Sequence, residues 1–176
     1  MAASTHDFSR WLEGELRSDH AGETGAVWIY KGVLAARPDA QLRQFCERHL
    51  KTEENHLAQI NALLPRNAHS ALLPLWRLAG FLTGFIPACF GQKAVYQTIE
   101  AVEAFVQTHY QQQIVHPDLI AAPDIRATLE ACLTDEISHK DEAASLAGTE
   151  RSALARLWCW LVGAGSKHAV ALARLL

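Results

Sequence analysis

The sequence lacks the loops that mark most nucleotide-binding enzymes. It contains no Gly-x-Gly-x-x-Gly and no P-loop, so any nicotinamide or nucleotide would have to bind without these motifs. Cysteine is also scarce: there are four, widely spaced, and no two form a Cys-x-x-Cys pair. These spacings argue against a zinc knuckle or a disulfide framework and indicate reduced thiols in a cytosolic setting.

Long apolar runs and an excess of positive charge are missing as well. No uninterrupted apolar stretch reaches about 18 residues, so no helix is expected to span a membrane. The N-terminus has neither a basic nor an apolar region, so no secretory signal is expected. The formal net charge of −3 argues against nucleic acid as a partner. With 176 residues, 49% of them hydrophobic, the chain fits one globular domain over residues 1–176.

What the sequence does contain is the periodicity of amphipathic helices. Prolines and glycines divide it into about six segments, in most of which apolar side chains recur every three to four residues. The expected segments are residues 8–36, 39–64, 72–91, 92–115, 124–147 and 153–176, with a short loop between Pro117 and Pro123. Asp39 and Ser152 are suitable N-caps, and Gly148 is a suitable C-cap. The sequence therefore predicts an all-α fold.

The segment 72–91 differs from the others because it is apolar almost all round. Pro74, Arg77 and Pro87 interrupt it, so it is too broken to span a bilayer as a straight helix. A buried cross-connection or a re-entrant or interfacial segment fits better. The C-terminal segment, 152–176, is also rich in leucine and tryptophan and is a second candidate for contact with lipid or a partner.

Two Glu-x-x-His motifs lie on separate helical segments. They are Glu53-x-x-His56 and Glu136-x-x-His139. Residues three apart share one face of a helix, about 5–6 Å apart at Cβ, so a carboxylate and an imidazole can converge on one ion. The periodicity places the first motif on the apolar seam of its helix. For the second motif it does not decide whether His139 or Lys140 faces inward.

Two further glutamates, Glu23 and Glu103, lie on the seams of two other segments. They precede the two motifs by 30 and 33 residues, and each has a tyrosine seven residues later, Tyr30 and Tyr110. The chain thus has a weak internal repeat: two helix pairs, each with a Glu and then Glu-x-x-His, joined by a long connection. This arrangement is expected of a ferritin-like four-helix bundle, in which such residues form a two-metal site.

The seam acids have few cations with which to pair. One seam glutamate alone is more often part of a surface ion pair. Four together are costly to bury unless metal ions neutralise them, and two divalent cations would balance four carboxylates. Imidazole and carboxylate ligands suit Fe, Mn or Zn, and ligand type alone does not choose among these metals.

The other polar residues near the seams have less specific interpretations. We expect His49 to be a core histidine rather than a ligand. His20 and His109 are candidates either for support of a metal site or for contact with a substrate. Asp135 is a candidate acceptor for the free N–H of one of the two motif histidines.

The motifs together resemble the demethoxyubiquinone hydroxylases of ubiquinone biosynthesis. The similar segments are Asp19-His20-Ala21-Gly22-Glu23-Thr24-Gly25-Ala26, Ile29-Tyr30-x-Gly32, Glu53-x-x-His56-Leu57, Val102-Glu103, His109-Tyr110, Gln113-Ile114, Asp135-Glu136-x-x-His139-x-Asp141, Leu73-Pro74-Leu75-Trp76 and Gly80-Phe81. The resemblance runs from about residue 16 to the C-terminus. It implies a ferritin-like di-iron monooxygenase. Its two iron ions would be held by Glu23, Glu53, His56, Glu103, Glu136 and His139.

The same resemblance implies a substrate and a location. With O₂, the enzyme would hydroxylate the ring of a demethoxyubiquinol-type polyprenyl quinol, with electrons ultimately from NADH or another reductant. His109 and Tyr110 would lie near the quinol or relay electrons. Segments 72–91 and 152–176 would be partly membrane-interfacial helices on a peripheral protein at the cytoplasmic face of the inner membrane. An accessory protein that presents the lipid and a homo-oligomer remain open.

Three other interpretations compete with this one. The first is another ferritin-like di-iron oxidase or hydroxylase, such as a peroxidase or a tRNA hydroxylase; the charge counts against the latter. The second is a ferritin-like iron store, which would not need lipid-facing segments. The third is a non-catalytic quinone-binding protein on a membrane surface, which predicts that the seam glutamates are replaceable without loss of product.

Overall fold

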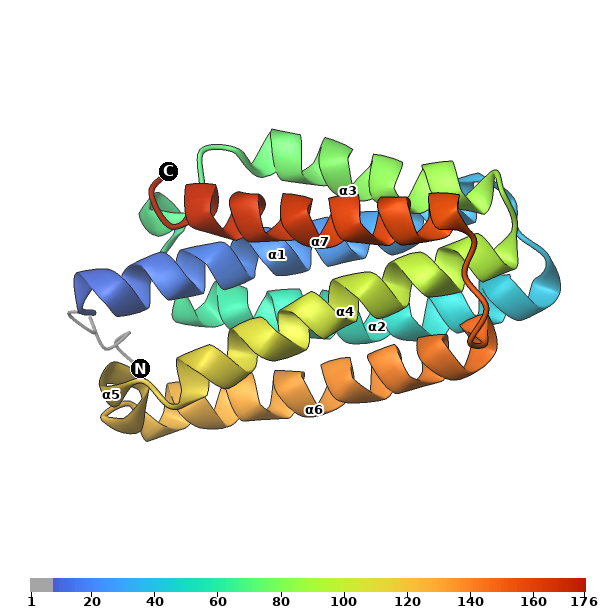
Figure 1. Cartoon of the computed structure of the whole chain (residues 1–176). Coiled ribbons are helices and arrows are strands. Elements are labelled where there is room, and N and C mark those ends of the chain that lie inside the picture. Colours follow the sequence, from blue (N-terminus) through green and yellow to red (C-terminus); the bar gives the residue numbers. More distant parts are fainter. Residues whose placement is uncertain (1–7) are drawn as a thin grey trace.

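Four long helices form a bundle around the interior of the molecule (Figure 1). In the computed structural model, which describes residues 8–176, they are α1 (Arg10–Ala35), α2 (Ala40–Leu63), α4 (Gln92–Ile114) and α6 (Pro123–Ala147). Two further helices, α3 (Leu73–Ala88) and α7 (Ala153–Ala173), cover one side of the bundle; α3 packs on α1, and α7 packs on α4 and α1. No strand occurs between residues 8 and 176. The prediction of an all-α bundle with two additional helices is confirmed.

The predicted helix caps are present. The Asp39 carboxylate accepts a hydrogen bond from the backbone N–H of Leu42 at 2.9 Å, and the Ser152 hydroxyl accepts one from Ala155 at 3.1 Å. Gly148 follows α6 with a φ of 68°, a conformation that glycine adopts without strain. Each side-chain cap contributes about 1 kcal/mol to helix stability. These helices therefore begin and end where local chemistry dictates.

Two of the connecting segments contain more helix than the sequence suggests. The residues expected as a loop include a single-turn helix, α5 (Pro117–Ile120), because Pro117 takes a first-turn position where its missing N–H costs nothing. That loop prediction was therefore wrong. Segment 72–91 forms the continuous helix α3, because Pro74 lies in its first turn and Pro87 in its last. A short 3-10 helix, η1 (Arg66–Ala68), precedes it.

The sequence predicts neither a membrane-spanning helix nor a secretory signal. Within the described residues, none of the helices has the length and apolarity needed to cross a bilayer. The expectation of no secretory signal concerns the N-terminus, and residues 1–7 of it lie outside the described part of the chain.

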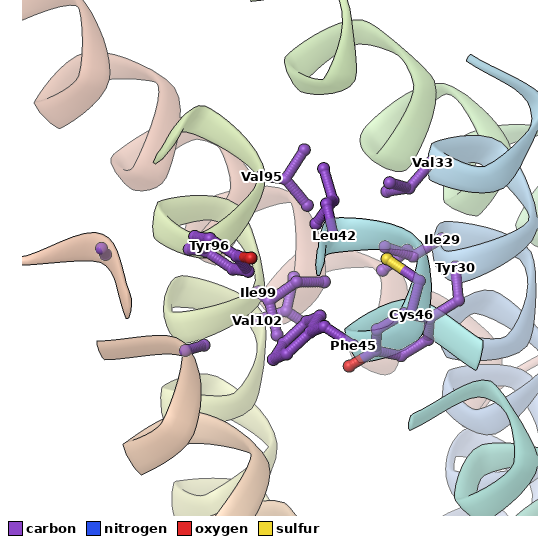
Figure 2. Close-up of a cluster of buried hydrophobic side chains, with 12 residues drawn as sticks. Ile29, Tyr30, Val33, Leu42, Phe45, Cys46, Val95, Tyr96, Ile99 and Val102 are labelled. Atoms are coloured by element: carbon purple, nitrogen blue, oxygen red, sulfur yellow. The ribbon is translucent and has the colours of Figure 1, made fainter. Parts of the chain in front are cut away.

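Two apolar clusters fill the ends of the bundle. Figure 2 shows the first, where α1, α2 and α4 contribute side chains such as Tyr30, Phe45 and Ile99, each at most 2% exposed. The second lies toward the other end of the bundle, where α1 contributes Leu16 and α6 contributes Leu129. Burial of one such side chain contributes about 1.5–3 kcal/mol. Along α1, α2 and α6, the seam residues Glu23, Glu53 and Glu136 lie between side chains of the two clusters.

Helix α3 lies against α1 with backbone touching backbone. A Cβ on Gly84 would lie 1.9 Å from the carbonyl oxygen of Ile29, and one on Gly80 would lie 2.3 Å from that of Gly25. On α1, a Cβ on Gly32 would lie 2.2 Å from a carbonyl oxygen of α3. Close approach by a neighbour thus accounts for a glycine in the interior of α1, where it costs about 1 kcal/mol.

Replacement of Gly84 by alanine should destabilise the fold. The added methyl group collides with main chain, which cannot move aside as a side chain can, so we expect a loss of about 1–3 kcal/mol. Thermal unfolding followed by circular dichroism measures the effect. Gly163→Ala is the matched control, because a Cβ at Gly163 meets nothing within 4 Å. Equal melting temperatures for the two variants would contradict the contact between α1 and α3.

Candidate metal centre

Six buried acids and histidines from all four bundle helices meet between the two apolar clusters. They are Glu23 on α1, Glu53 and His56 on α2, Glu103 on α4, and Glu136 and His139 on α6, all at most 7% exposed. They fall into two overlapping groups, in each of which the potential ligand atoms lie within 4.8 Å of one another. Group A is Glu23, Glu53, His56 and Glu136, and group B is Glu53, Glu103, Glu136 and His139. The structure thus brings together every residue that the resemblance implied as a ligand.

Both motif histidines point into the cluster. Nδ1 of His139 lies 3.0 Å from Oε1 of Glu53, and Nδ1 of His56 lies 3.2 Å from Oε1 of Glu136. Lys140 turns away, and its ammonium group donates to a glutamine of α4 at 2.7 Å. The structure therefore answers the question that helical periodicity left open, in favour of His139.

Several polar atoms of the cluster are buried without a hydrogen bond of acceptable geometry. They are both carboxylate oxygens of Glu53, one oxygen each of Glu23 and Glu136, and Nδ1 of His139. Among the described residues, the only ion-pair partners of the six are one another and Asp135. A buried polar atom left unpaired costs about 1–3 kcal/mol. Two divalent cations would satisfy these atoms and balance four carboxylates, so the residues fit a two-metal site.

Burial and mutual contact set the protonation of the cluster. Burial, followed by repulsion from Glu136, raises the pKa of Glu23 and of Glu103 well above its ordinary value. Burial also acts to raise the pKa of Glu136, but hydrogen bonds with His139 and His56 lower it to about 2. Against the effect of burial, neighbouring carboxylates raise the pKa of His139 to about 9. Without a cation the cluster holds protons, which must leave when metal binds.

Each of the two repeat tyrosines donates a hydrogen bond to the glutamate of the other repeat, on a different helix. The hydroxyl of Tyr110, which follows Glu103 on α4, donates to Glu23 at 2.5 Å. The hydroxyl of Tyr30, which follows Glu23 on α1, donates to Glu103 at 3.4 Å. The sequence showed the spacing of these tyrosines but not the exchange, because periodicity predicts which face a residue occupies and not which helix it meets.

Two residues lie behind the histidines of the cluster. Asp135 lies 3.0 Å from Nε2 of His56, which decides between the two partners proposed for it. His49 stacks on the ring of His139 with centroids 4.0 Å apart, and its Nε2 lies 2.9 Å from Glu142. His49 belongs to neither group, as expected of a core histidine. Sequence reasoning missed Glu142, because it lies off the apolar seam.

His109 and His20, which had equal claims from the sequence, have different surroundings. Nε2 of His109 lies 3.0 Å from Oδ1 of Asp19, and the same oxygen accepts a hydrogen bond from Gln113 at 2.8 Å. His20 instead stacks on His69 with ring centroids 4.0 Å apart. Only His109 lines the cavity that adjoins the cluster.

This cavity has a volume of about 370 Å³. Its polar lining includes Glu23, Glu103, Glu136, His109 and Tyr110, and the rest of its wall is mainly apolar side chains of α1, α3, α4 and α7. Cavities of this size and composition typically bind small organic molecules. No sequence pattern predicts this cavity, because its wall depends on how α3 and α7 sit over the bundle.

Comparison with known proteins places the chain in a family and identifies relatives with similar sequences. Residues 10–173 match the family of ubiquinone biosynthesis protein COQ7. A 3-demethoxyubiquinol 3-hydroxylase of Rhodospirillum rubrum is 38% identical over 129 residues, covering 72% of this chain and 60% of that protein. An NADPH-dependent 3-demethoxyubiquinone 3-hydroxylase of Dictyostelium discoideum is 31% identical over 132 residues, 73% of this chain and 61% of that protein. The chain thus spans about three fifths of the length of these two relatives. For a protein of the same description from Caenorhabditis elegans, 28% identity extends over 89% of its length.

Proposed function

The chain belongs to the family of ubiquinone biosynthesis protein COQ7, and we propose that it hydroxylates the ring of a demethoxyubiquinol-type polyprenyl quinol with O₂. The observation that carries this proposal is a buried cluster of four carboxylates and two imidazoles beside an apolar cavity. The names of the relatives support the substrate class, since two of them are described as acting on 3-demethoxyubiquinol or 3-demethoxyubiquinone.

Two iron ions would occupy groups A and B, with Glu53 and Glu136 shared between them. Bound iron supplies the activation of O₂. The protein contributes a fixed ligand geometry and a dry site. All six ligands are buried, and Tyr110, Asp135 and Tyr30 restrain three of them from outside.

His109 and Tyr110 are the residues proposed to meet the quinol ring. With Nε2 of His109 donating to Asp19, which also accepts from Gln113, Nδ1 is the nitrogen available to a quinol hydroxyl. The hydroxyl of Tyr110 is committed to Glu23, so Tyr110 offers its ring face and links substrate to ligand. Electrons would come from a reduced nicotinamide, which the printed name of the D. discoideum relative gives for that protein.

The outer faces of α3 and α7 are proposed to rest on a membrane surface. Fifteen large apolar residues are exposed in the described part of the chain, and twelve belong to these helices or their ends. They are Leu75, Leu78, Leu82, Ile86, Phe90, Leu154, Leu157, Trp160, Leu161, Leu172, Leu175 and Leu176. Single exposed apolar residues are common on protein surfaces, but a continuous patch of this kind indicates contact with a lipid surface or a partner. The cavity lies directly beneath these two helices. A polyprenyl tail could therefore remain in lipid while the ring enters the cavity.

Replacement of Leu82 and Trp160 together by aspartate should release the protein from membranes. Each apolar side chain contributes about 1.5–3 kcal/mol when buried, so the vesicle partition coefficient should fall at least about tenfold. Flotation with vesicles of phosphatidylcholine and phosphatidylglycerol measures it. The control is Val115→Asp with Leu146→Asp, which changes two exposed apolar residues elsewhere. If both pairs reduce binding alike, the α3 and α7 face has no special part in it.

The catalytic proposal is tested with the purified chain loaded with Fe²⁺. It is given a demethoxyubiquinol, a reductant and isotopically labelled O₂, and the quinol is examined by mass spectrometry. We expect one labelled oxygen atom in the product ring. Iron uptake without incorporation of labelled oxygen would overturn the hydroxylase proposal and favour a non-catalytic quinone-binding or iron-storing role.

A further inference from the structure

The two halves of the cluster are built alike at the ligands themselves. Each group has one glutamate of its own, one histidine of its own, and the shared pair Glu53 and Glu136. Each unshared glutamate accepts a hydrogen bond from a tyrosine across the bundle. The internal repeat of the sequence thus becomes an approximate twofold relation between group A and group B.

The twofold relation does not extend to the residues that contact the far side of the two histidine rings. In group A, Nε2 of His56 is within hydrogen-bond distance of Asp135, which directly precedes the ligand Glu136 on the opposite helix. The counterpart of Asp135 in the repeat is Thr52, which directly precedes Glu53. Its hydroxyl donates at 3.5 Å to a backbone carbonyl of its own helix instead.

As a result, the histidine of group B has no acidic partner outside the cluster. Within residues 8–176, the acids that contact His139 are Glu53 and Glu136, both at Nδ1, and no acid contacts its Nε2. The ring of His49 stacks against it, but both nitrogens of His49 are engaged elsewhere. Stacking restrains the plane of the His139 ring without fixing its tautomer or adding negative charge.

The tyrosine contacts differ in the same direction. The hydrogen bond from Tyr110 to Glu23 in group A is 2.5 Å long, whereas that from Tyr30 to Glu103 in group B is 3.4 Å long. The shorter contact holds its side chain more firmly, because a hydrogen bond weakens as it lengthens.

A carboxylate behind a ligating histidine has two physical effects. It fixes the ring and its tautomer before metal arrives, and it makes the nitrogen facing the ion a better donor of electron density. Loss of such a partner typically lowers metal affinity by about 10–100-fold. Group A has this support and group B does not.

We propose that the two ion positions are unequal, with group A binding its ion tightly and group B binding weakly, and that Asp135 is the positioning residue responsible. This inference rests on the proposed two-metal function. It assigns an order of loading: the position between α1 and α2 fills first, and the position between α4 and α6 fills last and empties first.

The test measures each position separately, so that cooperation between ions cannot hide the difference. In metal-free full-length protein, Glu103→Gln leaves group A complete and Glu23→Gln leaves group B complete. Titration with Co²⁺, followed by its visible absorption, gives the affinity of each. We expect the Glu103→Gln protein to bind about 10–100-fold more tightly than the Glu23→Gln protein.

Two further substitutions tie the difference to its cause. Asp135→Ala should weaken Co²⁺ binding in the Glu103→Gln protein and leave the Glu23→Gln protein unchanged. Thr52→Asp should strengthen binding in the Glu23→Gln protein, because it supplies the acid that His139 lacks. Thermal unfolding of the metal-free variants shows that each is folded.

Failure of the proposed inequality can be distinguished from failure of the proposed two-metal function. Equal Co²⁺ affinities in the two single variants would overturn the inequality, and equal weakening of both by Asp135→Ala would overturn the role of Asp135. Either result would leave the two-metal proposal standing. Failure of the unsubstituted protein to bind Co²⁺ at all would overturn both.

Discussion

Replacement of Glu103 by glutamine should abolish hydroxylation while leaving the protein folded. Loss of a residue that merely supports a ligand costs about 10–100-fold in metal affinity or activity, and loss of the ligand itself should exceed that. We expect product formation to fall at least about a thousandfold, together with a fall from two iron ions per chain to one. Quinol hydroxylation is measured by mass spectrometry and iron by elemental analysis of the same sample.

The stability of the metal-free protein distinguishes a metal ligand from a structural acid. Burial holds the pKa of Glu103 well above its ordinary value, so without metal the interior favours its neutral, protonated form. Glutamine is also neutral and nearly the same shape, so unfolding should occur at the same temperature or slightly higher. Glu54→Gln serves as the control, since Glu54 pairs with Lys31 at the surface. Undiminished turnover in the Glu103→Gln protein would remove Glu103 from the metal site.

Replacement of Gly22 by leucine should block the substrate without disturbing the metal. Gly22 lines the cavity beside Glu23, and a Cβ there meets no atom within 4 Å. The leucine side chain would therefore occupy space that we assign to the quinol ring. A displacement of about 1 Å at the reacting atoms costs about 100-fold in rate, so kcat/KM should fall at least that much.

The same substitution should make the protein more stable. Leucine is favoured over glycine in a helix interior by close to 1 kcal/mol, and nothing around the position opposes it. Gly163→Leu is the control, because Gly163 also has open space around it but does not line the cavity. It should gain stability and retain turnover. Normal kcat/KM in the Gly22→Leu protein would show that the quinol does not use this cavity.

The features that could be predicted from the sequence are those fixed by position along a single helix. The seam periodicity located Glu23, Glu53, His56 and Glu103 on inward faces, and the caps Asp39 and Gly148 located helix ends. Both depend on backbone geometry within a few residues, which local sequence determines. The repeat of Glu and Glu-x-x-His then indicated four helices around one cluster.

The features that could not be predicted depend on how helices pack. His139 and Lys140 are adjacent, and only the angle of α6 against α4 turns one inward and the other toward Gln107. Likewise, the spacing of the tyrosines did not reveal that the hydroxyl of Tyr30 donates a hydrogen bond to Glu103. The cavity could not be predicted either. It is the space between α1 and α4 under α3, which packs on α1, and α7, which packs on α4 and α1.

The backbone contact between α1 and α3 couples the position of α3 to that of the candidate metal centre. The close backbone contacts fall at Gly25, Ile29 and Gly32, on the turns of α1 that follow Glu23, so α3 is held directly against this part of α1. Helix α7 has open space at Gly163 and Gly165 and lacks any such clamp. If the outer face of α3 rests on a membrane surface as proposed, its depth among the lipid headgroups would set the height of the cluster above the bilayer. Under the proposed function, adjustment to rings or tails of different bulk would fall to α7.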